Sequence, residues 1–298
     1  FVFCWIHVLV TSQVDMSQFA SILENIPEKW EKLAPVPFRK MITYPARIAI
    51  TYEEPLLMLL MTVWCVTRSS DVVSGELGRG TMEMLLAQPV SRLQVFLTPV
   101  FITILGIVGL ATLAYAGTCV GVATAIVERP EEGSAFGIPF ADLLLGGNRD
   151  ANLEKIPMNK LVSYRMFIPA ALNYGCLGMF LAGVCTLFSA FDRYRWRTVG
   201  LMMAFYIANM LAEILGKAFP AFSWAREVSF FRAYEPVMFI SESVSRPELG
   251  WSWTITDSAD RFVELGPLAC DALLLVIGLL AFVVAGVVFC RRDIPAPV

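Results

Sequence analysis

Long stretches without a charged residue constrain this sequence more than any other feature. No Asp, Glu, Lys or Arg occurs between Arg92 and Glu128 or between Arg165 and Asp192, and the run LLLVIGLLAFVVAGVVF before Cys290 is almost purely aliphatic. An α-helix needs about 20 mostly apolar residues to cross a bilayer core of about 30 Å. Three helices of this chain are therefore predicted to cross a membrane.

Three further spans are less regular. Thr198–Ala212 is uncharged and continues to Gly216, whereas Pro55–Thr67 needs the residues from Ile48 onward to complete a crossing. The apolar stretch Phe1–Val10 would rise only about 15 Å as a helix, and the sequence begins with Phe, so we expect a first helix that is truncated at its N-terminus. The sequence thus predicts an all-α membrane protein, a single transmembrane domain over 1–298, with six helices at about 1–14, 48–67, 95–127, 163–190, 198–218 and 267–290.

Composition excludes several classes of protein. With 57% hydrophobic residues, 16% charged residues and a net charge of −3, the chain resembles neither a disordered nor a nucleic-acid-binding protein. Its seven cysteines form no C-x-x-C pair, and it has a single histidine, His7. The pair Gly216-Lys217 lacks the other residues of a phosphate-binding loop. We therefore expect no catalytic residue, no metal and no cofactor bound by this chain.

Arginine-rich connections predict the orientation. Three arginines lie in the loop 191–197, two follow Cys290, and Arg79 and Arg92 lie in the loop 69–94. Short basic loops stay in the cytoplasm. The longer connections 11–47, 128–162 and 219–265 are then external, and both termini are cytoplasmic. We expect an integral protein of a bacterial plasma (inner) membrane.

Two external segments are rich in aromatic residues. Trp30, Phe38 and Tyr44 alternate with basic residues, and 219–234 contains several Phe, Trp and Tyr residues. Both patterns predict interfacial helices in the long external loops, the second partly re-entrant. Ordinary aromatic belts beside the spans explain them equally well.

The loop from Ser69 to Arg92 is the most distinctive segment. Gly75 and Gly80 allow sharp chain reversals, and Thr81 can cap a short helix that ends before Pro89. On this helix Met82, Leu85 and Leu86 share one face. A helix this short is not stable alone, so it must dock on the membrane, on the bundle or on a partner.

The residues of this loop also resemble a known signature. Asp71, Gly75-Glu76, Gly80-Thr81, Glu83, Leu85-Leu86 and Gln88–Arg92 are similar to the pattern G-E, G-T, E-x-L-L-A-x-P-x-S-R of the type-2 ATP-binding-cassette (ABC) permease family. In that family the signature lies between the second and third membrane helices, as it does here. The resemblance implies a segment that contacts a separate ABC ATPase subunit, which binds ATP, and a second permease chain that pairs as a homodimer or heterodimer.

The resemblance also implies roles for individual residues. The expected ATPase-coupling residues are Gly75, Glu76, Gly80, Thr81, Glu83, Leu85, Leu86, Pro89 and Arg92. Glu76 and Glu83 would pair with basic groups of the ATPase, the glycines would set the elbow, and Leu85 and Leu86 would anchor the short helix. The same residues could instead stabilise the loop without touching a partner.

Four polar residues lie inside the predicted spans. Ionisable and amide side chains in a membrane are candidates for a substrate path, and here they are Asn173, Asn209, Glu213 and Asp271. The alternative is structural: Glu213 and Lys217 stand in the favourable i, i+4 order, and Asp271 lies near a helix start. Residues this near the interface are easily solvated, which favours the structural alternative.

Two functions fit these observations. The first is the membrane subunit of an ABC transporter, expected to be an exporter, whose energy comes from a partner ATPase. The second is a non-transporting ABC-type membrane module that transmits the motion of the ATPase to an external partner. A transporter needs a polar or adaptable cavity between its helices, whereas a transmitter can be packed shut.

Overall fold

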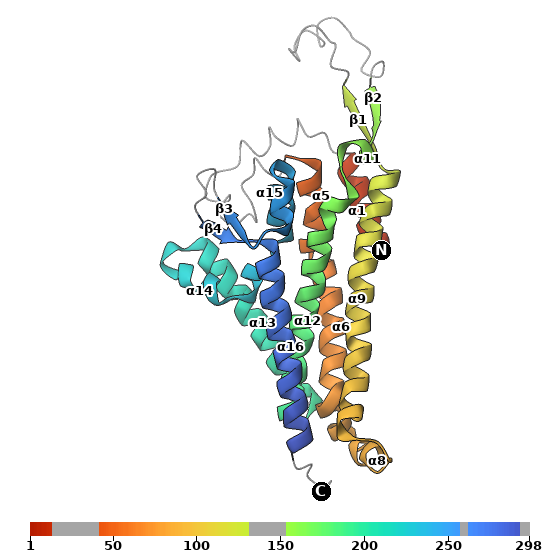
Figure 1. The fold of residues 1–298 in the computed structure, drawn as a ribbon, viewed down its shortest axis with the longest axis vertical. Helices are drawn as coiled ribbons and strands as arrows, with labels where there is room; N and C mark the ends of the chain where they lie inside the picture. The colour runs from red at the N-terminus through yellow and green to blue at the C-terminus, as the bar shows by residue number, and fades with distance from the viewer. Residues whose placement is uncertain (14–41, 131–152, 257–261, 293–298) are drawn as a thin grey trace, which may run out of the picture.

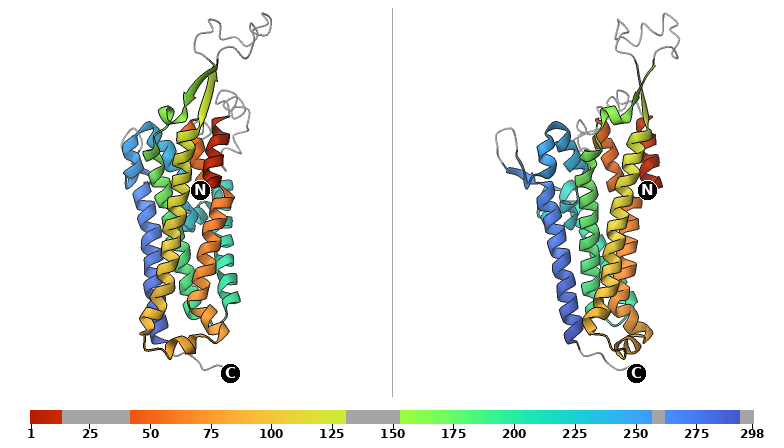
Figure 2. Two further views of the ribbon diagram at one scale, coloured as in Figure 1. Left: turned by 90° about the vertical axis from the view of Figure 1, so that its right-hand side faces the viewer. Right: turned by 45° about the vertical axis from the view of Figure 1, so that its right-hand side comes forward.

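The computed structural model describes residues 1–13, 42–130, 153–256 and 262–292. These residues form an elongated bundle of helices, and the three views agree that the last turn of α16 (Pro267–Arg291) lies at the same end as α8 (Met82–Leu86) (Figures 1 and 2). A hairpin of β1 (Ile126–Pro130) and β2 (Leu153–Pro157) projects from the opposite end. We refer to these as the α8 end and the hairpin end.

Five helical segments are long and apolar enough to cross a membrane. They are Tyr44–Arg79, Arg92–Thr124, Tyr164–Phe191, Arg195–Ala218 and Pro267–Arg291. The helix α1 (Val2–Ser12) is apolar but shorter. The chain is therefore an integral membrane protein that is mainly helical, as expected, while the number of six spans stays a prediction.

The principal helices begin at residues suited to a helix start. Proline occupies the first turn of α5 (Tyr44–Glu53), α6 (Pro55–Ser70), α12 (Ile168–Phe191) and α16 (Pro267–Arg291), where its missing N–H costs nothing. The helix α9 (Arg92–Thr124) starts with a capping box between Ser91 and Gln94. The helix α13 (Arg195–Ala218) has no side-chain cap.

The centre of the bundle is α12, which is buried along most of its length and packs against α16, α6 and α9. Its closest contact is with α16, where a Cβ atom added to Gly183 would lie 2.2 Å from the carbonyl oxygen of Gly278. Small residues allow membrane helices to approach this closely. In contrast, only Thr198, Met202 and Glu213 of α13 are buried. The bundle therefore has one tightly packed helix pair and one helix at its edge.

The span that needed Ile48–Glu54 to complete a crossing is broken. Glu54 has extended backbone dihedral angles and separates α5 from α6, and Pro55 begins the second helix. Beside the break, the ring of His7 lies near two polar side chains. Its Nδ1 is 2.7 Å from Oγ1 of Thr51 in α5, and its Nε2 is 3.8 Å from Oε1 of Glu54. Polar contacts thus surround the discontinuity of the helix.

Short elements follow α13 at the hairpin end. They are η3 (Pro220–Phe222), α14 (Ser223–Val228), η4 (Phe230–Ala233), α15 (Pro236–Ser245), η5 (Pro247–Trp251) and a second hairpin of β3 (Thr254–Thr256) and β4 (Phe262–Leu265). The two small sheets were not expected. The prediction of an interfacial helix near Trp30 and Phe38 is not tested, because both residues lie outside the described residues.

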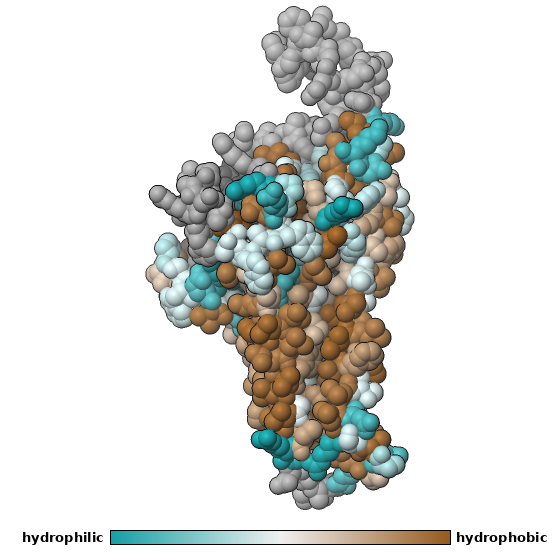
Figure 3. Space-filling model, viewed as in Figure 1, coloured by the Kyte–Doolittle hydropathy of each residue, from teal (hydrophilic) through white to brown (hydrophobic). Residues whose placement is uncertain are grey.

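Side chains of different polarity are segregated along the bundle. A band of hydrophobic residues covers the helices on the face seen in Figure 3, and hydrophilic residues follow it at the α8 end. The described segments at that end (68–92, 191–197 and 291–292) contain eight arginines and four acidic residues. This excess of positive charge is typical of a cytoplasmic membrane surface.

Candidate functional site

The segment Ser69–Arg92 forms an elbow at the α8 end of the bundle (Figures 1 and 2). From α6 the chain continues through a π-helical turn, η1 (Asp71–Gly75), into α7 (Glu76–Arg79). Gly80 then reverses the chain, α8 follows, and α9 begins at Arg92. The elbow therefore joins two membrane-spanning helices by three consecutive short helical turns.

The base of the elbow is η1, which two neighbouring helices hold in place. A π-turn leaves backbone groups without their usual α-helical partners. The hydroxyl of Ser189 on α12 accepts hydrogen bonds from the backbone N–H groups of Val73 and Ser74, at 3.3 and 2.9 Å. The hydroxyls of Thr198 on α13 and Ser74 lie 2.9 Å apart. All these groups are buried, so movement of η1 must displace the ends of α12 and α13.

Gly75 has a different role from the one expected. It does not reverse the chain, because its φ is −67° and it lies within the helical path. A Cβ atom there would lie 2.1 Å from Oδ1 of Asp71, so glycine makes room for that carboxylate. The prediction that Gly75 sets the elbow is thus wrong about its conformation.

Gly80 has the conformation that was expected. Its φ of +74° lies in the left-handed region, which glycine adopts without strain. It ends α7 and redirects the chain into α8. Pro89 lies three residues beyond Leu86, the last residue of α8.

Glu76 is bound within the elbow itself. Its carboxylate lies 2.5 Å from Nη2 of Arg79 and accepts a hydrogen bond from the hydroxyl of Thr81. Nη1 of Arg79 lies 2.8 Å from Asp71. Thr81 is the N-cap residue of α8, but its hydroxyl bonds to Glu76 and not to the helix. Glu76 therefore fixes the shape of the elbow, and an ion pair with a partner would have to compete with these bonds.

The exposed tip of the elbow is α8. Met82 is buried and Leu86 packs against the core, while Leu85 is exposed, so the face that these three residues were expected to share is only partly buried. Met84 is 72% exposed. Glu83 is exposed and forms no ion pair with any described residue. The tip thus offers one free carboxylate beside two exposed apolar side chains.

Arg92, the first residue of α9, binds the end of α16. Its Nη1 donates to the carbonyl oxygens of Arg292, at 3.1 Å, and of Cys290, at 3.5 Å. These carbonyls belong to the C-terminal end of α16, where a positive charge is favourable. Arg92 therefore connects the start of α9 with the end of α16.

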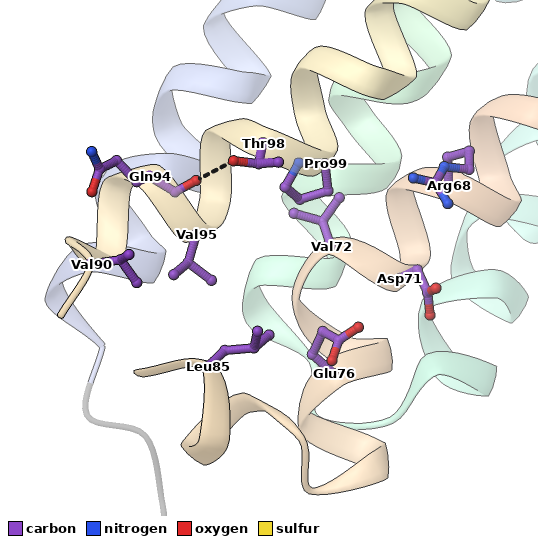
Figure 4. Close-up of a pocket in the computed structure, with 10 residues that line it drawn as sticks. All are labelled: Arg68, Asp71, Val72, Glu76, Leu85, Val90, Gln94, Val95, Thr98 and Pro99. Atoms are coloured by element: carbon purple, nitrogen blue, oxygen red, sulfur yellow. Dashed lines mark hydrogen bonds between the residues drawn. The ribbon is translucent and has the colours of Figure 1, made fainter. Parts of the chain in front are cut away.

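A hollow of about 380 Å³ lies between the elbow and α9 (Figure 4). Leu85 and Val95 point into it from α8 and α9, and Glu76 lines its side. Arg68, Asp71, Val72, Val90, Gln94, Thr98 and Pro99 complete the lining. The hollow undercuts the tip, so α8 is attached to the bundle through Met82 and Leu86 but not through Leu85.

The four predicted path residues all bond to other parts of the protein near the hairpin end. The side-chain amide of Asn173 is buried and donates to Asp271, at 2.8 Å, and to the carbonyl oxygen of Ala233, at 2.9 Å. Asn209 accepts hydrogen bonds from the hydroxyl of Ser229 and the N–H of Phe230. These contacts attach the spans to the segment that follows α13, and the substrate path stays a prediction.

Glu213 belongs to an ionic cluster around Arg226, which the sequence patterns did not reveal. The guanidinium lies 2.6 Å from Glu235, 3.3 Å from Glu213 and 3.6 Å from Glu264. Nζ of Lys217 is 3.1 Å from Glu213, the expected i, i+4 pair, and 3.7 Å from Glu235. Three carboxylates from three separate segments therefore converge on Arg226.

The burial of Glu235 affects the pKa of its carboxyl group. Its side chain is only 6% exposed. Burial raises the pKa of this carboxyl above its usual value, although the charges of Arg226 and Lys217 act in the opposite direction. Burial thus disfavours the carboxylate form of Glu235, and its two cationic neighbours offset this effect only in part.

Comparison of the chain with protein-family models, with curated proteins and with solved structures finds no match. Among the described residues no group of three His, Cys, Asp or Glu side chains could hold a metal ion.

Proposed function

We propose that this chain is the permease subunit of an ABC transporter, an exporter, in which a separate ATPase subunit binds the elbow 69–92. The α8 end then faces the cytoplasm. The excess of arginine at that end supports this orientation. The chain itself hydrolyses no ATP in this proposal.

The observation that carries the proposal is the contrast within the elbow. Its tip presents Glu83 and Met84 outward, whereas its base is hydrogen-bonded to Ser189 and Thr198. A partner that moves the tip therefore acts on η1, and η1 acts on the ends of α12 and α13. This arrangement suits the transfer of a conformational change into the membrane-spanning helices.

One observation favours the second candidate, a non-transporting module that transmits the motion of an ABC ATPase to an external partner. At the hairpin end, Asn173 and Asn209 form hydrogen bonds with the segment that follows α13. Motion of the spans would then move this segment. The same elbow serves both candidates.

The experiment is co-purification of the full chain, in nanodiscs, with the ABC ATPase encoded next to it. Glu83→Arg reverses the charge of α8 and breaks no ion pair or side-chain hydrogen bond between described residues. We expect it to weaken binding of the ATPase about tenfold or more, because it places like charges in contact with basic groups of the partner. The matched control is Glu248→Arg, an exposed residue of η5 at the hairpin end.

Two outcomes would contradict the proposal. One is an ATPase that fails to bind the wild-type chain. The other is equal loss of binding in both variants, which would point to a general effect of charge reversal. Substrate-stimulated ATP hydrolysis by the complex in proteoliposomes would favour the transporter, and its absence, with the ATPase bound, would favour the transmitting module.

A further inference from the structure

Two hollows join along the side of the bundle between α6 and α13. The first, about 750 Å³, lies at the α8 end, and the second, about 570 Å³, lies farther toward the hairpin end. Val66, Thr67 and Val199 line both, so the two hollows form one continuous groove. We call it the α6–α13 groove.

The second part of the groove is mainly apolar. Its walls include Met58, Leu59 and Val63 of α6, and Met203 and Met210 of α13. From Val199 to Met210 the groove follows α13 for about 16 Å. One leaflet of a bilayer contributes about half of a hydrocarbon core of about 30 Å. This part of the groove thus has the length and the polarity of a lipid acyl chain.

The end of the groove near α8 has different chemistry. Tyr194, Arg195 and Trp196 line it, and Trp196 is 70% exposed. Arg195 is held in place because its Nε and Nη2 donate to Ser70 Oγ and Thr67 O, both at 3.3 Å. Its Nη1 lies 3.5 Å from Oδ1 of Asp71, which compensates part of its charge. Aromatic and basic residues are the typical pair at the level of lipid headgroups.

Two arginines beside this end have no acidic partner among the described residues. The guanidinium of Arg197 lies 5.3 Å from the ring centres of both Tyr194 and Trp196, and that of Arg193 lies 6.0 Å from Tyr194. The nearby Asp192 instead accepts hydrogen bonds from the backbone N–H groups of Arg193 and Tyr194. Positive charge is therefore left uncompensated at one end of an apolar groove.

We propose that the α6–α13 groove binds one anionic phospholipid of the cytoplasmic leaflet. The headgroup phosphate lies against Arg193, Arg195 and Arg197, and an acyl chain extends along α13 toward Met210. Charge complementarity selects an anionic over a zwitterionic headgroup, because each arginine near the surface adds favourable energy only for the former. The proposal does not depend on the proposed transport function.

The experiment is native mass spectrometry of the delipidated full chain titrated with phosphatidylglycerol or phosphatidylcholine of the same acyl chains. We expect one phosphatidylglycerol to be retained and phosphatidylcholine to bind more weakly. The double variant Arg193→Gln/Arg197→Gln removes two positive charges and is expected to reduce the affinity for phosphatidylglycerol about tenfold or more.

Two further variants separate the headgroup from the groove. Met203→Trp fills the apolar part while leaving the arginines unchanged, and is expected to lower binding of phosphatidylglycerol as well. The matched control is Lys160→Gln/Arg165→Gln, which removes two exposed charges from the opposite membrane surface and should retain the lipid.

Three results would overturn the proposal. They are equal binding of the two lipids, unchanged binding in the Arg193→Gln/Arg197→Gln variant, or equal loss of binding in the control. A lipid-free wild-type dimer that Met203→Trp converts into monomers would also overturn it, since the groove would then hold a second copy of the chain. Thermal unfolding of each variant without lipid verifies that it is folded.

Discussion

Arginine residues form multiple ion pairs at both ends of the bundle, but their surroundings differ. Arg79 at the α8 end pairs with Asp71 and Glu76, and its side chain is 46% exposed. Arg226 at the hairpin end pairs with Glu235 and Glu213, and these carboxylates are only 6% and 10% exposed. Exposed pairs contribute little to stability, whereas removal of one partner from a buried pair leaves a charge without compensation. The same chemistry therefore forms an adjustable contact at one end and a fixed attachment at the other.

The largest expected effect comes from Arg226→Gln. The substitution leaves Glu235 and Glu213 buried with only Lys217 as a cationic neighbour, so we expect the free energy of unfolding to fall by about 3 kcal/mol. Thermal unfolding in nanodiscs measures the change. The control is Arg232→Gln, since Arg232 pairs with Glu227, which is 61% exposed, and should cost less than about 1 kcal/mol. Equal effects of the two substitutions would contradict the distinction by burial.

A smaller effect is expected from the titration of Glu235. Burial raises its pKa in the folded protein above the ordinary value of 4.5. At any pH between 4.5 and the raised pKa, the folded state therefore binds more protons than the unfolded state. The contribution of Glu235 to stability is then greatest below pH 4.5 and is lost as the pH rises through the folded pKa. Comparison of the unfolding temperature at pH 5 and pH 8 should show this decrease in the wild type and a weaker one in Glu235→Gln. Parallel pH profiles would show that Glu235 is not the group that titrates.

The smallest effect is expected from Arg79→Gln. Its exposed ion pairs with Asp71 and Glu76 contribute less than about 1 kcal/mol and are weakened by salt. The wild type and the variant should therefore differ slightly in unfolding temperature at low ionic strength and not at all in about 1 M salt. A difference that persists in high salt would mean that the elbow is held as firmly as the hairpin end.

Periodicity and charge predicted the parts of the molecule that a membrane determines. The uncharged runs correspond to α9, α12 and α16, and the pair Glu213–Lys217 forms as the i, i+4 spacing predicts. Gly80 has the left-handed conformation that its place in the turn suggests. These features depend on local chain geometry and on the solvent around it, both of which can be inferred from sequence.

Contacts between distant segments could not be predicted in this way. Arg226 and Glu264 lie 38 positions apart, and no local pattern links them with Glu235. Gly75 suggested a turn, but its role arises from the side chain of Asp71. Leu85 matched a helical face that is only partly buried, because the position of α9 leaves a hollow beneath it. Tertiary packing determines each of these features.

The close contact between Gly183 and Gly278 has a consequence for how the molecule deforms. Backbone atoms of α12 and α16 touch with no side chain between them, so neither helix can rotate against the other without a direct collision. The edge helix α13 is held in a different way: Gly216 lies close to the backbone of Arg226 at the hairpin end, and few of its residues are buried in the bundle. We therefore expect the α12–α16 pair to move as one unit in any change of shape, with α13 shifting against it more readily than the two helices shift against each other.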